Sequence, residues 1–537
     1  MRRPLLALVA LSAAAAVAAS PAASVEAQVA KNGGTITVAQ PFEPACLNPL
    51  LAKCANSSPS VGFGVEKAIL PAFDVDARFR FRPRLVSGVT VSARPPYTLT
   101  YHIRPAARWN DGVPVTAADF VFTHQARLRQ AGSLSPGERA QLRQVRRVVA
   151  VGPKTVRVTL REPFSGWQRL FPNVLPRHVL AGQDLSKIWI DRVDDPKTGK
   201  PIGDGPFLID GLQRGRTLTL IRNPAYWGPH LARLDRLVLR YDFDDPAAEL
   251  ENNRVDMALV IPAPLAAPFL RNPAFRVVAP PAAGYDHLAM NMRPGAGGHP
   301  ALRNPLVRRA LAYGIDRAAI VRAVDAIAPL QSVIYLAQSP YQHANWQRYR
   351  RRPALARALL ARAGCKRGAD GIYSCAGRRM SLRFVTSAGV PPRQAALGVV
   401  QLQLRTIGVE VVPTYVSQTV FVDTALTRGQ FDVVLFGWVF DPDPSSAATI
   451  YSCRGADNYT GYCSTSVTQA LTRASRMLDP AAQARVLNVA DRMIAADVPV
   501  LPLIQLNPAS VIRANVKGFV MPPYNPYADA ENWWLER

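Results

Sequence analysis

The stretch "FDVVLFGWVFDPDP", residues Phe431 to Pro444, decides the fold. Its first eight residues, Phe431 to Trp438, form a run that is apolar except for Asp432. A strand that is apolar at successive positions is buried on both faces, as in a parallel sheet covered by helices. The run therefore predicts a central strand of an α/β fold.

The residues after this run are a candidate ligand site. Gly437 to Pro444 contain an aromatic residue and two acids, Asp441 and Asp443. Ligands of open α/β sheets bind beyond the carboxyl ends of the strands, and an aromatic residue with acids at that point suits a polar or cationic group. The alternative is a loop in which each Asp bonds the backbone before a Pro. The local sequence leaves both interpretations open.

The pattern of apolar and polar residues outside this run also indicates α/β structure. Apolar and polar residues alternate from Tyr97 to Ile103, and "VVAVGPKTVRVTL", residues 148–160, predicts a hairpin. After about residue 300, helical and strand patterns alternate. Asn304 is a good N-cap, Pro305 a good first helical residue, and Gly314 can end that helix.

A second stretch, "RWNDGVPVTAADFVFTHQ", raises the question of catalysis. Trp109, Asp111 and Asp119 resemble parts of an enzyme site. However, Asn110 to Gly112 is typical of a turn, and Thr116 with Asp119 three residues later is a capping-box pattern. We therefore predict a structural role for this stretch.

The sequence contains no recognisable catalytic or nucleotide-binding motif. It lacks G-x-S-x-G, H-E-x-x-H, G-x-x-x-x-G-K-[ST] and G-x-G-x-x-G. The formal net charge is +26, but the basic residues are spread along the chain without the interleaved aromatic residues of a single-strand binder. We expect no nucleic-acid partner, no cofactor and no metal.

The N-terminus has the pattern of a secretory signal peptide. Arg2 and Arg3 precede an apolar segment from Leu5 to Ala19, and small residues follow. Cleavage after Ala27 fits the small-x-Ala rule, with Ala23 and Ala30 as alternatives, so residues 1–27 are the predicted signal. Since the first cysteine is at position 46, we expect an exported, soluble protein without a lipid anchor, periplasmic or extracellular.

The six cysteines fall into three close pairs. Their spacing does not match zinc knuckles, and an oxidising compartment favours disulfides. The predicted bridges are Cys46–Cys54, Cys365–Cys375 and Cys453–Cys463.

Several motifs, in order along the chain, are similar to those of the family 5 extracellular solute-binding proteins, the receptors of peptide and nickel ABC importers. Trp109 to Phe120 resembles "W-x-D-G-x-P-V-T-A-x-D-F". The others are "IGDGPF" at 202–207, "IRNPAYW" at 221–227, "NNRVDMA" at 252–258, "NPLVRRALAYGIDR" at 304–317, and the later "QLRTIGVEV" and "FDVVLFGW".

The resemblance implies a two-lobed periplasmic-binding-protein fold with a hinge and an inter-lobe ligand cleft. Lobe I would span residues 31–282, including an inserted β-rich subdomain, and would end with residues 503–537. Lobe II would span residues 283–502. The cleft would close over its ligand by hinge motion.

The resemblance also implies a function without catalysis. The chain would be a monomeric receptor that captures di- or oligopeptides and delivers them to an ABC permease and ATPase complex. Asp441 occupies the position that takes the ligand's α-amino group, with Gly437, Trp438, Phe440 and Asp443 around it. One departure is that a single residue, Pro442, separates Asp441 from Asp443. Alternative cargoes are an oligosaccharide or a metal complex. Rival functions are a secreted hydrolase and a transcription regulator, the latter requiring a helix-turn-helix where the signal lies.

Overall fold

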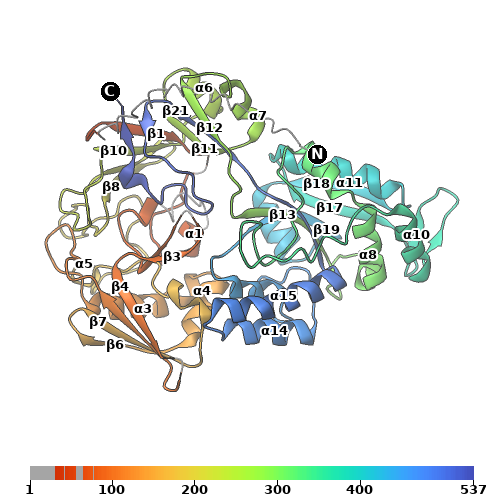
Figure 1. The fold of residues 1–537 in the computed structure, drawn as a ribbon, viewed down its shortest axis with the longest axis horizontal. Helices are drawn as coiled ribbons and strands as arrows, with labels where there is room; N and C mark the ends of the chain where they lie inside the picture. Colours follow the sequence, from red (N-terminus) through yellow and green to blue (C-terminus); the bar gives the residue numbers. More distant parts are fainter. Residues whose placement is uncertain (1–30, 42, 56–63, 77, 93, 537) are drawn as a thin grey trace, which may run out of the picture.

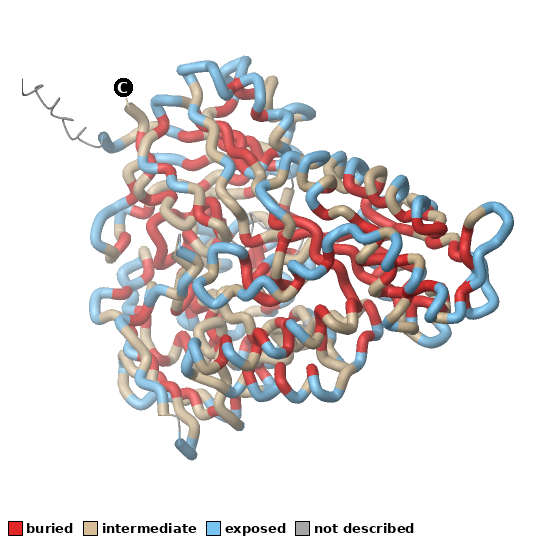
Figure 2. The backbone as a smooth tube through the Cα atoms, turned by 45° about the vertical axis from the view of Figure 1, so that its right-hand side comes forward, coloured by how far each residue is buried: buried red, intermediate tan, exposed pale blue. Residues whose placement is uncertain are grey.

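The protein forms two lobes that lie side by side (Figure 1). This computed structural model describes residues 31–41, 43–55, 64–76, 78–92 and 94–536. The predicted signal peptide, residues 1–27, lies outside the described residues. One lobe, here lobe I, has its main core between residues 36 and 259 and between 512 and 533. The other, lobe II, has its core between residues 288 and 504, and buried segments run through the middle of both lobes (Figure 2).

Lobe II is built on a mixed five-stranded sheet. The strand order is β18 (Glu410–Val416), β17 (Ser381–Ser387), β19 (Val433–Val439), β13 (Gly284–Met290), β20 (Val500–Gln505). The predicted buried strand is β19, and Val433 to Leu435 have no exposed surface. It runs parallel to β17 but antiparallel to β13. Residues of α8 (Pro305–Gly314), α11 (Pro391–Arg405) and α15 (Pro480–Asp497) join the same core, so the predicted α/β class is confirmed.

Lobe I contains two larger sheets, besides the two-stranded pairs of β2 (Phe73–Val75) with β3 (Phe81–Pro83) and of β22 (Val516–Lys517) with β23 (Trp534–Leu535). The seven-stranded sheet has the order β12 (Phe275–Val278), β21 (Ala509–Arg513), β11 (Met257–Ile261), β1 (Thr35–Ala39), β10 (Arg236–Arg240), β9 (Thr217–Arg222), β8 (Phe207–Gln213). The four-stranded sheet has the order β4 (Val86–Ser92), β5 (Thr98–Ile103), β7 (Thr155–Leu160), β6 (Val145–Gly152). The predicted hairpin of residues 148–160 is the pair β6–β7.

Two segments connect the lobes and run side by side. One joins β12 to β13 and the other joins β20 to β21. The Ala282 amide donates to the Leu506 carbonyl at 2.8 Å, and the Leu506 amide donates to the Gly284 carbonyl at 2.8 Å. β20 continues in the lobe II sheet through Gln505, three residues past the predicted end of lobe II at residue 502, and the boundaries near 282 and 502 remain predictions.

The helix-start signals work as the sequence predicts. Asn304 accepts a hydrogen bond from the Leu306 amide at 2.9 Å at the start of α8. In α3 (Ala117–Arg129) the Asp119 carboxylate accepts from the Thr116 amide at 2.7 Å. Trp109 has no exposed surface, so it belongs to the core of lobe I and the stretch around it is structural.

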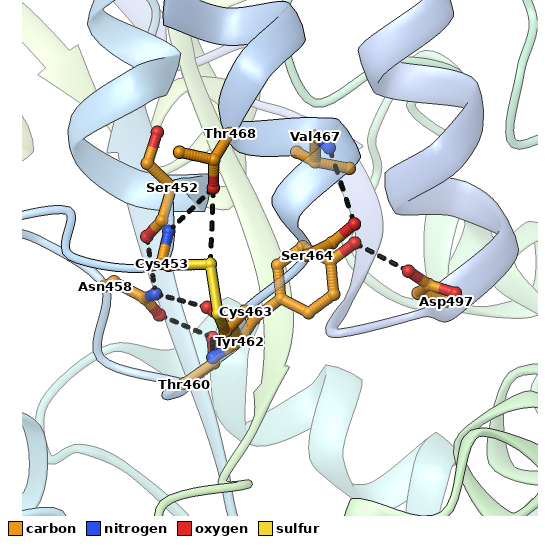
Figure 3. The surroundings of a disulfide bond; sticks show 10 residues. All are labelled: Ser452, Cys453, Asn458, Thr460, Tyr462, Cys463, Ser464, Val467, Thr468 and Asp497. Atoms are coloured by element: carbon orange, nitrogen blue, oxygen red, sulfur yellow. Dashed lines mark hydrogen bonds between the residues drawn. A yellow bond between two sulfur atoms is a disulfide. The ribbon is translucent and has the colours of Figure 1, made fainter.

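The three predicted cysteine pairs are each joined by a disulfide. The Cys453–Cys463 bridge closes a loop that is also held by hydrogen bonds (Figure 3). Asn458 Nδ2 donates to the carbonyls of Ser452 at 2.9 Å and Tyr462 at 2.7 Å. The bridge therefore supports a loop with its own internal structure. In the part of the chain that the structure describes, no helix has the length and apolar character to cross a membrane.

Candidate functional site

A cavity of about 780 Å³ lies between the two lobes. Both lobes and the first connecting segment line it. Lobe I contributes from residues 78–81, 165–168 and 521–523, lobe II from 334–341, 440–444 and 477–483, and the connection from Pro280 and Pro281. This volume is in the range of small-molecule and peptide sites.

Three of the five predicted site residues reach this cavity. Phe440, Asp441 and Asp443 line it, directly beyond the carboxyl end of β19. Gly437 and Trp438 are not among the described lining residues. Gly437 lies against β13, where an added Cβ would be 2.8 Å from an Asp286 side-chain oxygen. Trp438 stacks on Tyr459, with ring centroids 5.9 Å apart. Gly437 and Trp438 therefore pack against the protein next to the loop and do not line the cavity.

Asp441 is held in place by two donors. Its Oδ1 accepts from Arg169 Nε at 2.7 Å and from the Asp443 amide at 2.8 Å. Arg169 belongs to lobe I, at the end of η2 (Ser165–Arg169), so this ion pair crosses the cleft. Within the described residues, no hydrogen bond engages Asp441 Oδ2. That oxygen is therefore available to a donor in the cavity.

Arg169 is a site residue that no pattern in the sequence indicates. Its guanidinium lies 5.4 Å from the ring centroids of both Phe81 and Tyr524. Burial lowers the pKa of Arg169, but the Asp441 charge, Tyr524 and the hydrogen bonds to both residues together more than offset this and raise the pKa above the ordinary value. Arg169 is 272 residues away from Asp441 in the chain, and no local pattern links the two.

Asp443 receives hydrogen bonds from both lobes. Its Oδ1 accepts from the Ser165 hydroxyl of lobe I and from the Ser445 amide, both at 3.2 Å. Its Oδ2 accepts from the Ser445 hydroxyl at 2.5 Å. Burial, and then the nearby charge of Asp441, raise the pKa of Asp443 to about 6. This carboxyl therefore changes its charge close to neutral pH.

The lobes meet closely around Asp443. A Cβ added to Gly166 would lie 2.5 Å from Asp443 Oδ2, so only glycine permits this approach. Farther out, Arg476 of lobe II pairs with Glu162 of lobe I at 2.6 Å. Together with the Arg169–Asp441 pair, these contacts show that the structure is in a closed form.

The rest of the cavity wall is mainly apolar. Its aromatic and thioether side chains are those of Phe79, Phe81, Trp167, Tyr335, Tyr341, Phe440, Met477 and Met521. Arg78 is exposed at the wall, whereas Arg80 pairs with Asp76 at 3.2 Å. The described lining contains serine hydroxyls but no histidine to act as their base. The arrangement suits binding of a molecule with an apolar body and a cationic group.

Comparison with known proteins places this geometry in a family. Residues 80–460 match the model of the bacterial extracellular solute-binding proteins, family 5 (Middle). The oligopeptide-binding protein OppA of Mycobacterium tuberculosis (strain ATCC 25618 / H37Rv) is 27% identical over 453 residues, which cover 81% of this chain and 73% of that protein.

Two solved structures share the fold. The periplasmic EDTA-binding protein EppA superposes with a TM-score of 0.84 at 20% identity, over 97% of this chain and 100% of the other. The oligopeptide-binding protein AppA from Bacillus subtilis, in complex with a nonapeptide, superposes with a TM-score of 0.79 at 21% identity, over 95% and 100%. The predicted two-lobed fold is thereby confirmed.

Proposed function

Because this chain belongs to the family 5 bacterial extracellular solute-binding proteins, which are binding proteins and not enzymes, we propose that it captures peptides in the inter-lobe cleft. The exported receptor delivers them to the permease and ATPase complex of an ABC importer. The observation that carries the proposal is the cavity of about 780 Å³ with two carboxylates, Asp441 and Asp443, in an otherwise mainly apolar wall.

The amino end of the peptide binds at Asp441. Its Oδ1 is fixed by Arg169 and the Asp443 amide, and its Oδ2 has no hydrogen bond to the described residues, in a residue that lines the cavity. An ammonium has three donors, so it can bond this oxygen and still reach Asp443. In a closed cleft such a charged pair is little screened by salt.

The remainder of the peptide lies against the apolar wall. Aromatic and methionine side chains of both lobes accept apolar peptide side chains as water leaves the cavity. The exposed guanidinium of Arg78 is placed to attract a carboxylate at the other end. The cavity therefore favours short peptides with free ends over highly charged cargo.

The test compares Ala-Phe-Leu with its N-acetylated form by calorimetry. Asp441→Asn removes the acceptor charge and also leaves the buried guanidinium of Arg169 without its partner. We expect binding of the free-amine peptide to weaken by roughly 30-fold or more, because breaking one partner of a buried charged pair costs about 2–5 kcal/mol. The N-acetylated peptide should bind the parent weakly and lose little more in the variant.

Asp443→Asn is the matched control for the residue assignment. If this variant alone loses affinity for the free-amine peptide, the amine partner is Asp443 and not Asp441. A metal chelate such as iron–EDTA is tested in parallel, since EppA, which shares the fold, is an EDTA-binding protein. Binding of the chelate without any binding of peptide would leave the receptor role standing and refute the peptide cargo.

A further inference from the structure

A group of four exposed arginine side chains lies outside the cleft, on lobe II. Arg348, Arg350, Arg352 and Arg492 line one open hollow of about 520 Å³, together with Asn345 and Gln347. The hollow shares no lining residue with the cleft cavity. Its four arginines therefore do not line the cargo site.

The loop that carries three of these arginines is firmly anchored. Trp346 has no exposed surface and donates from Nε1 to Asp491 at 3.0 Å. Asn345 Nδ2 donates to the same carboxylate at 2.7 Å, and the Tyr349 hydroxyl donates to the Ala495 carbonyl at 2.6 Å. Because Trp346 and Tyr349 point inward onto α15, the residues between and after them point outward.

The arginines of the hollow have no acidic partner. All four are exposed, and none forms a salt bridge with another residue in the described part of the chain. Elsewhere many arginines do pair, for example Arg240 with Asp242 and Arg393 with Asp286. Asp491, the acid beneath the loop, is fully buried and binds Trp346 and Asn345.

Four guanidinium groups around one hollow repel each other unless an anion lies between them. Each guanidinium presents a planar fork of donors that matches two oxygens of a phosphate group. In addition, α10 (Pro353–Arg362) begins directly after Arg352, and the N-terminus of a helix adds positive potential. A ligand with two or more negative charges on phosphate-type oxygens satisfies these donors best.

We propose that this hollow is an anion site for a phosphate-bearing ligand, separate from the cargo cleft. A soluble phosphate compound and an anionic lipid headgroup offer the same chemistry.

Calorimetry with inorganic pyrophosphate tests the site on the full chain at low ionic strength. We expect the double variant Arg348→Gln/Arg350→Gln to bind pyrophosphate about tenfold or more weakly than the parent. The matched control, Arg146→Gln/Arg147→Gln, removes the same charge from exposed positions of β6 in lobe I. It should change the affinity less than about twofold.

Sedimentation with vesicles distinguishes the two sources of the ligand. Vesicles of phosphatidylcholine are compared with vesicles that also contain phosphatidylglycerol. Pyrophosphate binding that depends on Arg348 and Arg350 supports a soluble phosphate compound. Binding only to the phosphatidylglycerol vesicles, lost in the same variant, supports a headgroup. The proposal is overturned if neither probe binds, or if both double variants lose binding equally, which would indicate attraction by net charge alone.

Discussion

Asp443 is a residue whose charge depends on the closed cleft around it. Burial and the charge of Asp441 raise its pKa to about 6. A bound ammonium favours the ionised carboxylate, so binding of a free-amine peptide is strongest above pH 6 and weakens as the pH falls through 6. The amino group of the peptide stays charged over this range.

We expect the affinity for Ala-Phe-Leu to fall about tenfold between pH 7 and pH 5, because about one carboxyl in ten then remains ionised. Calorimetry at both pH values measures this, and Asp443→Asn should lose the dependence. N-acetylated peptide gives the baseline for any general effect of pH on the protein. An equal affinity of the parent at both pH values would contradict this assignment.

At the scale of residues, the sequence indicated the acids of the cavity but not what holds them. Asp441 and Asp443 directly follow the predicted strand, which made them candidates, and the family resemblance then favoured Asp441 over a purely structural loop. Arg169 and Ser165 come from lobe I, and they reach these acids only through the closed arrangement of the two lobes. Such long-range contacts have no signal in local periodicity.

At the scale of elements, substitutions in the turn and helix around Trp109 test whether this stretch stabilises the fold or takes part in function. Asp119 is buried and accepts from the Thr116 amide at 2.7 Å and the Arg177 amide at 2.9 Å. Asp119→Ala leaves both amides without a partner, which should lower the free energy of unfolding by about 2–4 kcal/mol. Urea denaturation followed by fluorescence measures the loss.

Asp111→Ala is the control for that variant. Asp111 lies in the same segment, but its carboxylate is 38% exposed and pairs with His178 at 2.7 Å. Its loss should cost less than about 1 kcal/mol. Neither variant should change the peptide affinity of the folded protein. A specific loss of binding in the folded Asp119→Ala protein would mean that this stretch takes part in function after all.

The sequence correctly predicts that the strand β19 exists, but it does not predict the direction of both neighbouring strands. The apolar run predicted a buried strand of a parallel sheet, and β19 is indeed buried and parallel to β17. Its other neighbour, β13, is antiparallel. Burial on both faces depends on the helices that cover the sheet, and it does not encode the direction of each neighbour.

At the scale of the whole molecule, the contact between Glu162 and Arg476 tests closure of the lobes. Each residue is partly exposed, at 37% and 50%, so the pair contributes only about 0.2–1 kcal/mol. Glu162→Arg places two like charges across the cleft. We expect it to weaken peptide binding by about two- to fivefold and to expand the molecule in small-angle X-ray scattering.

The double reversal, Glu162→Arg with Arg476→Glu, restores an attractive pair. It should recover the affinity and the compact scattering profile of the parent. Failure of the double variant to recover either property would indicate that the effect of Glu162→Arg comes from local damage to lobe I and not from closure.

The position of β21 in the seven-stranded sheet of lobe I sets the order in which the two lobes can be completed during synthesis. This strand lies between β12 and β11 (Figure 1), yet it is formed by residues 509–513, close to the end of the chain. The first and last strands of lobe II, in contrast, are neighbours, with Tyr285 opposite Gln505. All strands of the lobe II sheet are therefore present once residue 505 has been synthesised. Lobe I begins earlier in the chain, but its seven-stranded sheet is complete only after residue 513. Hydrogen exchange on a chain that ends at residue 505 should accordingly protect β13 and β19, whereas the edge of β11 that pairs with β21, and β12 beyond it, should be protected only in the complete chain.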